Sequence, residues 1–306
     1  MKKIVFMGTP DFSVPTLQNL YNDTDIDLLF VVTKNDKKSE RGMKVTFSPI
    51  KRFCIQNNIK YYQSNKLKND ENLINIIKNA KPDFIIVVAF GEILSKEILE
   101  IPKACINGHA SLLPKYRGAS PIQNCILNGD KTTGVTTMLM SEGLDCGDIL
   151  LKKEIVLDGT ETCGDLFDIL SKMTADLINK SIKEYDNIKK IPQDEKDASY
   201  VKLVKKEDGY VDLKNEEYDL LYRKIRAYNP WPTVYTKFDN KILKLYNVEK
   251  VDNISFNDII NIDDVFFISN KNLYAKLKNE IIRILDLQFE GKKRMLAKDF
   301  INGFKK

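Results

Sequence analysis

The sequence predicts an α/β protein in which a Rossmann-like, mostly parallel sheet domain is followed by a smaller β-barrel (OB-like) domain. Short apolar strands alternate with helical segments over about the first 180 residues, a pattern typical of an open parallel sheet. The continuous apolar run PDFIIVVAFGEIL (82–94) is typical of a central strand buried on both faces. Beyond residue 206, short alternating runs separated by Asn, Asp and Gly indicate a small all-β domain.

The expected elements of the first domain follow one another as strand and helix. Ser13 is a candidate N-cap for the first helix, which it precedes directly. The expected strands are 2–8, 26–34, 82–94, 103–110 and 134–140, and the expected helices are about 13–21, 49–57 and 69–79. We therefore expect a catalytic domain over residues 1–187 and a polar linker over 188–206.

A C-terminal β-barrel domain is expected over residues 207–306. A helix over 215–229 precedes its strands, which are expected at 233–239, 241–248, 265–270, 272–277 and 280–289.

Composition excludes several classes of function. Five scattered cysteines form no CxxC pair, and the chain has a single histidine, so we expect reduced thiols and no metal site. Neither GxGxxG nor a Walker loop is present, which argues against a dinucleotide or ATP site. The start is too short for a secretory signal, and the longest apolar run, Phe84 to Phe90, is far below the roughly 20 residues of a membrane span. We expect a cytoplasmic protein without a membrane partner.

Positive charge is concentrated in one segment. Residues 34–52 carry seven Lys/Arg against two Asp/Glu, which equals the net charge of +5 for the whole chain. The segment is either a solvated charged loop or a loop that faces phosphate groups.

The lone histidine, His109, lies where the expected strand 103–110 ends, and ligands bind beyond the carboxyl ends of strands in such sheets. Asn107 is two residues earlier, so both side chains leave the same face. Asp145 follows the strand 134–140, and it meets His109 if the two strands are neighbours. Asp, His and Asn together form a plausible set for proton transfer and oxyanion stabilisation. The alternatives are a packing histidine, a turn residue at Asp145 and a strand-end cap at Asn107.

The turn after the histidine is apolar and stiff, because it contains Leu112, Leu113 and Pro114. Such residues beside a polar set suit a flat aromatic ligand. Lys115 and Arg117 follow, and they could meet a carboxylate or simply be solvated.

Several of these segments carry a resemblance to a known family. NGHASLLPKYRGASPIQ followed by GVTTMLMSEGLDCGDIL resembles the signature of the 10-formyltetrahydrofolate-dependent formyltransferases, Asn-x-His-x-Ser-Leu-Leu-Pro and then Leu-Asp-x-Gly-Asp. FMGTPDFSVPTL, RGMKVTFSPIK, VVAFGEILSKEIL and RAYNPWPTVY are similar, in the same order, to the members that act on methionyl-initiator tRNA. The resemblance covers nearly the whole chain.

The resemblance implies an enzyme that transfers the formyl group of 10-formyltetrahydrofolate to the α-amine of methionyl-initiator tRNA, giving N-formylmethionyl-tRNA for translation initiation. It implies that Asn107, His109 and Asp145 are catalytic. It further implies that the folate pocket is lined by Ser111, Leu112, Leu113 and Pro114. We expect no metal, and we expect a monomer.

For the tRNA, the resemblance implies contacts from Arg41 and Lys44 in the basic loop, with help from the C-terminal domain. One departure from the family pattern is Gly108, where a branched or larger apolar residue is usual. Glycine gives the backbone more freedom, so we expect a looser strand beside His109.

Other functions stay open at this point. The same chemistry could serve an amino-sugar nucleotide or glycinamide ribonucleotide, or water could be the acceptor. A non-catalytic RNA-binding protein on the same scaffold is the alternative from another class.

Overall fold

The computed structural model describes residues 1–38, 45–239, 241–252 and 257–303, which form two compact units. The first unit comprises Met1–Pro121, Thr132–Val156 and Phe167–Val201. The second comprises Ile122–Lys131, Leu157–Leu166 and Lys202–Lys306.

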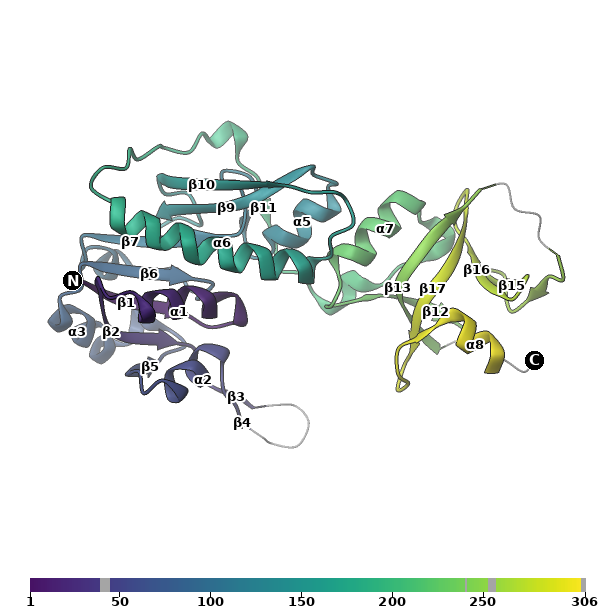
Figure 1. Cartoon of the computed structure of the whole chain (residues 1–306), viewed down its shortest axis with the longest axis horizontal. Coiled ribbons are helices and arrows are strands. Elements are labelled where there is room, and N and C mark those ends of the chain that lie inside the picture. The colour runs from purple at the N-terminus through teal and green to yellow at the C-terminus, as the bar shows by residue number, and fades with distance from the viewer. Residues whose placement is uncertain (39–44, 240, 253–256, 304–306) are drawn as a thin grey trace. The chain divides into compact units, whose positions relative to one another are not determined.

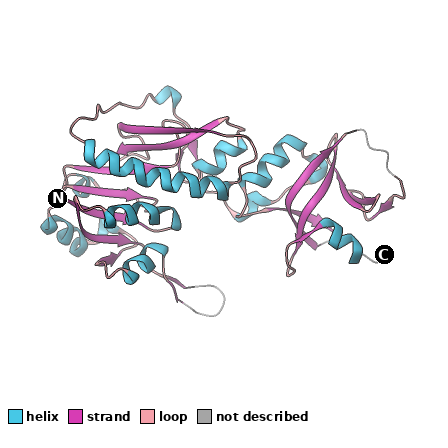
Figure 2. Ribbon diagram, in the orientation of Figure 1, coloured by secondary structure: helices cyan, strands magenta, loops and turns pink. Residues whose placement is uncertain are grey.

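The first unit is built on a seven-stranded sheet in the order β10-β9-β7-β6-β1-β2-β5 (Figures 1 and 2). The five strands from β7 to β5 are parallel, whereas β9 and β10 are antiparallel additions at one edge. The bounds are β1 Lys2–Gly8, β2 Ile26–Thr33, β5 Tyr61–Gln63, β6 Phe84–Val88, β7 Ala104–His109, β9 Thr132–Leu139 and β10 Ile149–Val156. The expected Rossmann-like, mostly parallel sheet is confirmed.

Helices cover both faces of this sheet. The helices and 3₁₀ turns are η1 Asp11–Ser13, α1 Val14–Asn22, α2 Pro49–Gln56, η2 Leu67–Asn69, α3 Glu71–Ala80, α4 Lys96–Leu99, α6 Cys163–Glu184 and η3 Glu195–Asp197, and α6 begins in the second unit. Alternate residues of the central strands, such as Val5 and Val87, pack beneath Ile74 and Ile77 of α3. The opposite face of the sheet, to which Gly108 of β7 belongs, is covered by α6. Helix α6 lies beside α1 in Figure 1. Burial on both faces explains why β6 is a continuous apolar run.

Ser13 precedes α1 as expected, but its side chain does not cap the helix. The hydroxyl instead donates to the carbonyl oxygen of Val88 at 2.6 Å, both groups being buried. The prediction of the helix start was therefore right and that of the side-chain cap was wrong, because Ser13 ends the 3₁₀ turn η1 and has helical backbone angles in place of the extended ones of a capping residue.

Two short strand pairs complete the first unit. The strands are β3 Lys37–Lys38 with β4 Val45–Thr46, and β8 Arg117–Gly118 with β11 Tyr200–Val201. The second pair is parallel, and its strand β11 lies in the segment that we expected to be a linker, 188–206. This segment therefore pairs with the first unit up to Val201.

The second unit is a small antiparallel β domain, as expected. Its strands pair in the order β12-β13-β17-β16-β15-β14, with β18 on β17. The bounds are β12 Val234–Phe238, β13 Lys241–Val251, β14 Ile260–Asn261, β15 Phe266–Ser269, β16 Asn272–Lys276, β17 Ile281–Phe289 and β18 Met295–Leu296, with α5 Pro121–Leu127, η4 Lys206–Gly209, η5 Leu213–Asn215, α7 Tyr218–Ala227 and α8 Ala297–Gly303. Rings of Phe238, Phe266, Phe289 and Phe300 pack together within its core.

None of the helices in the described ranges combines the length and the apolar character that crossing a membrane requires.

Gly108 is the last residue but one of β7, paired with Val88 on one side and Thr137 on the other. A Cβ atom at this position would lie 2.5 Å from Cγ2 of Thr174 in α6. The glycine therefore serves close packing of the helix on the sheet, and it is not a loose point in an otherwise regular strand. The larger residue of the family pattern would need a smaller neighbour on α6.

We expect Gly108→Ala to destabilise the protein by about 1–3 kcal/mol, because the added methyl group overpacks the contact with Thr174. Thr174→Ser removes that methyl group and keeps the hydroxyl, which donates to Leu170 O at 2.7 Å. The double variant conserves volume, so it should regain most of the lost stability. Urea unfolding of the three variants measures this; a Gly108→Ala protein as stable as the wild type would contradict the packing argument.

Candidate active site

His109 is the last residue of β7, where the sequence places it, but the strand beside it runs in the opposite direction. β9 is the neighbour of β7, as the prediction required, and His109 pairs with Thr136. Because the two strands are antiparallel, β9 leaves the sheet near the start of β7, where Met140 N donates to Cys105 O at 2.9 Å. The loop 140–148 must therefore turn back to bring Asp145 to the histidine.

The three predicted catalytic side chains do converge. Nδ1 of His109 lies 3.6 Å from Oδ2 of Asp145. Nδ2 of Asn107 lies 3.5 Å from Oδ1 of the same carboxylate. The side chains of His109 and Asp145 are 8% and 16% exposed, so the cluster is largely screened from water but open at Asp145. Both distances are long for hydrogen bonds, as is common for catalytic groups before substrate binds.

The other ring nitrogen of His109 is already bonded. Nε2 lies 2.9 Å from the carbonyl oxygen of Tyr116. A carbonyl oxygen accepts only, so Nε2 carries a proton and donates it. The nitrogen that can gain or lose a proton is therefore Nδ1, which faces Asp145.

Asp145 is held by more than its two catalytic neighbours. The backbone N–H of Gly118 donates to Oδ2 at 2.9 Å. The backbone of Asp145 has φ +49°, in the left-handed region that L-residues other than Asn and Asp seldom adopt. A non-glycine residue in this conformation at a cluster of polar groups is typical of functional sites.

The residues that the family pattern assigns to the folate pocket are placed differently from one another. Leu113 is fully buried and packs with Met138 and Ile149 in a small apolar cluster. Ser111 is also buried, and its hydroxyl donates to Lys115 O at 2.6 Å. The two that are partly exposed are Leu112 and Pro114.

Arg117 is fully buried, so the alternative of a solvated side chain is wrong. Its guanidinium meets a carboxylate of the chain itself, with Nη2 2.9 Å from Oε1 of Glu195. Nη1 also donates to the hydroxyl of Tyr200 at 2.8 Å. Burial alone would lower the pKa of Arg117, but the hydrogen bonds to Glu195 and Tyr200 outweigh it and raise the pKa above its ordinary value.

The proposed tRNA contacts Arg41 and Lys44 lie outside the described residues. Around them, part of the positive charge of the basic segment is used within the protein. Lys34 pairs with Glu92 at 2.5 Å, and the buried Lys51 pairs with Asp36 at 2.5 Å. Asp36 is already part of the count over 34–52, but Glu92 lies outside the segment, so its pairing with Lys34 lowers the net charge that the segment offers to a partner.

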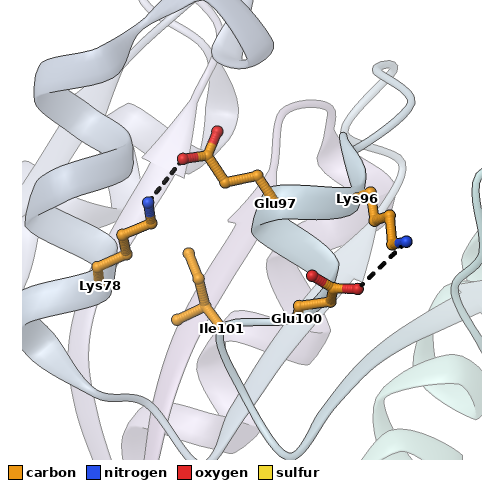
Figure 3. A pocket seen from close by; sticks show the side chains of 5 residues that line it. All are labelled: Lys78, Lys96, Glu97, Glu100 and Ile101. Carbon is orange, nitrogen blue, oxygen red and sulfur yellow. Dashed lines mark hydrogen bonds and ion pairs between the residues drawn. The ribbon is translucent and has the colours of Figure 1, made fainter.

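A pocket between α3 and α4 is lined by Lys78, Lys96, Glu97, Glu100 and Ile101 (Figure 3). It lies near the start of β7, at the sheet edge opposite to His109. Its charges pair with one another, Lys78 with Glu97 at 2.6 Å and Lys96 with Glu100 at 3.7 Å. Nothing in it joins the catalytic cluster.

A Rossmann-like sheet that gathers Asn, His and Asp at one strand end has the residue types that proton transfer and oxyanion stabilisation use in group-transfer enzymes. The chain belongs to the formyl transferase family: the model for "Formyl transferase" matches residues 1–182, and that for "Formyl transferase, C-terminal domain" matches residues 203–305.

Relatives support the same family over the full length. The chain is 44% identical to the methionyl-tRNA formyltransferase of Clostridium acetobutylicum, over 99% of this chain and 97% of the relative. It is 42% identical to that of Clostridioides difficile, over 98% and 96%. Among solved structures, the N-formyltransferase of Helicobacter canadensis in complex with folinic acid and dTDP-3-aminofucose has a TM-score of 0.64 at 20% identity, covering 93% of this chain and 99% of that one. At that identity the likeness concerns the fold.

The cysteine thiols differ sharply in exposure. No disulfide joins them in the described structure. Burial raises the pKa of Cys54, Cys105 and Cys163 to about 12. Cys125 is buried as well, whereas Cys146 is partly exposed. Because the thiolate is the reactive form, the four buried thiols should react slowly.

We therefore expect a thiol reagent such as iodoacetamide to label Cys146 first in the native protein at pH 8, and to inactivate the enzyme because the adduct lies next to Asp145. Mass spectrometry of peptides against time measures the order of labelling. Cys146→Ser should keep its activity in the presence of the reagent. Equally fast labelling of any buried thiol in the folded protein would show that exposure does not set the order.

Proposed function

We propose that this protein transfers the formyl group of 10-formyltetrahydrofolate to the α-amine of methionyl-initiator tRNA and so produces N-formylmethionyl-tRNA for translation initiation. The observation that carries the proposal is the full-length similarity, at 38–44% identity, to relatives named methionyl-tRNA formyltransferase. The convergence of Asn107, His109 and Asp145 gives the chemistry a site. An enzyme that supplies translation initiation acts in the cytoplasm, and a monomer is the simplest form for it.

The geometry suggests a role for each side chain. The neutral amine attacks the formyl carbon and an oxyanion forms. An amide carries two N–H groups, and Asn107 uses one toward Asp145, which leaves the other to donate to the oxyanion. Because Nε2 keeps its proton on Tyr116 O, His109 donates from Nδ1 in its protonated form, and it stabilises the oxyanion together with Asn107. Asp145 orients His109 and takes the proton that the amine loses, while N10 of the folate gains one as it leaves.

For the folate, we propose that Leu112 and Pro114 supply the apolar contact, because they are the partly exposed members of the turn. Ser111 and Leu113 would act from beneath by keeping the turn in shape. Formyl transfer needs only the reacting groups and the donors already named, so the proposed steps run without a metal.

For the tRNA, we propose contacts from Arg41 and Lys44 and support from the C-terminal domain. Phosphate contacts release counterions, so the affinity for tRNA would fall as the salt concentration rises. Lys34 and Lys51, which have carboxylate partners, would contribute less than the sequence suggests.

Choice of acceptor tests the function. Purified protein with 10-formyltetrahydrofolate receives methionyl-initiator tRNA, methionyl-elongator tRNA, a UDP-amino sugar or buffer, and both formylated acceptor and tetrahydrofolate are measured. We expect rapid formylation of the initiator species alone. An amino sugar is the second candidate acceptor, because sugar N-formyltransferases share the fold at TM-scores of 0.62–0.64. Folate turnover without formylated tRNA would exclude the proposed acceptor.

We expect His109→Ala and Asp145→Asn to lower kcat about 100-fold or more, because each removes a group that meets charge in the transition state. Asparagine is the sharper replacement at position 145, since it tolerates the left-handed backbone and conserves shape. Melting temperatures near that of the wild type serve as the control for folding. Activity within about tenfold of the wild type in either variant would remove that residue from the catalytic set.

A further inference from the structure

The segment that follows α6 packs against the two loops of the candidate site, the turn after His109 and the loop 140–148. The backbone N–H of Arg117 donates to Ser199 O at 2.8 Å, and Tyr116 N donates to the hydroxyl of Ser199 at 2.8 Å. Gly118 has φ +112°, and a Cβ atom there would lie 2.4 Å from Val201 O, so only glycine permits this approach. The residues expected as a linker are thus built into the site.

One side chain of this segment joins two parts of the site. Nε2 of Gln193 donates to the carbonyl oxygens of Asp145 and Gly147, at 2.9 and 2.7 Å. Oε1 of Gln193 accepts from Nε of Arg117 at 3.0 Å. The amide has two N–H groups and one oxygen, and all of them are used. The acceptors on one side and the guanidinium on the other fix which way the amide points.

The side chain of Arg117, to which Gln193 is bonded, is itself held in place by several contacts. It is fully buried, between Glu195 at 2.9 Å and the Tyr200 ring at 5.5 Å. The same hydrogen bond that raises the pKa of Arg117 lowers that of Glu195, so both partners stay charged at neutral pH. The backbone of Arg117 also lies beside Gly118, whose N–H binds the carboxylate of Asp145.

Asp145 needs such a support. Its left-handed backbone is uncommon for residues with a side chain, although Asp tolerates it better than most, and such conformations persist where neighbouring contacts determine them. Gln193 bonds to the carbonyl of Asp145 itself, and Gly118 bonds to its carboxylate. The two hydrogen bonds therefore hold both the backbone and the side chain of Asp145 in place.

We propose that Gln193 is a positioning residue that holds Asp145 against His109 and Asn107 by bridging the Asp145 loop to Arg117. The proposal rests on the proposed function for its kinetic consequence, but the bridge itself can be tested without a substrate. Gln193 touches no reacting atom. It acts through the placement of the carboxylate, where an error of about 1 Å costs about 100-fold in rate.

The first test uses the thiol of Cys146 as a probe of the loop, with no substrate present. We expect Gln193→Ala to raise the labelling rate of Cys146 about tenfold, because the loop opens more often without its two hydrogen bonds. Lys196→Ala, a change at an exposed neighbour in the same segment, should leave the rate unchanged. Global unfolding would be seen as labelling of the buried Cys54 and Cys163 as well. A folded Gln193→Ala protein with a wild-type rate at Cys146 would overturn the proposal.

The second test is a double-mutant cycle on kcat at saturating substrates. We expect Gln193→Ala to lower kcat about 100-fold in the wild-type background, with the KM for the formyl donor changed by less than about threefold. In the Asp145→Asn background the same change should cost less than about twofold, because the group that it positions is already gone. Gln193→Glu, which sets a carboxylate against two carbonyl oxygens, should be at least as harmful as Gln193→Ala. Equal losses in both backgrounds would show a general structural effect and overturn the positioning role.

The two tests separate this proposal from the proposed function. If the wild-type protein formylates no tRNA, the proposed function fails, and the labelling rates still decide whether Gln193 holds the loop.

Discussion

Asp145 has a left-handed backbone conformation, which is uncommon for residues with a side chain and which Asp tolerates better than most, and its carboxylate joins the other functional groups of the site. One oxygen faces the amide of Asn107, and the other faces His109 and accepts from Gly118. The geometry of the cluster therefore depends on how well the protein holds a single uncommon turn. Gln193 supports this turn by a hydrogen bond to the backbone carbonyl oxygen of Asp145, and Gly118 by one to its carboxylate.

The sheet explains why such a support is needed. In an all-parallel sheet, two neighbouring strands would end at the same edge and bring their loops together directly. Here β9 is antiparallel to β7, so its chain leaves at the far end and has to return to His109. A returning loop has no ladder to fix it. The stretch after α6 supplies the missing contacts, and that is why a polar segment resembling a linker pairs with β8.

The sequence predicts the fold class and the catalytic cluster because both depend on local patterns: apolar strands and polar residues where strands end. It does not reveal α6, the 22-residue helix that packs on Gly108. Its buried face includes Ser171, Thr174 and Ser181, which interrupt the apolar period. Hydroxyls can be buried there because Thr174 and Ser181 donate to carbonyl oxygens four residues earlier. A pattern of apolar residues cannot anticipate that arrangement.

Electrostatic partners are the least predictable part, because they are set by distant residues. Lys34 finds Glu92, 58 positions away, and Arg117 finds Glu195, 78 positions away. The first pairing neutralises a charge that the count over 34–52 includes, and the second gives a carboxylate partner within the chain to a residue that could equally have been solvated. A cation that stays paired with a carboxylate does not neutralise a phosphate, so it displaces none of the counterions condensed on the nucleic acid and adds nothing to the salt dependence of binding. Under the proposed function, Lys34 and Lys51 therefore add little to the binding of tRNA, and Arg41 and Lys44 stay the proposed contacts.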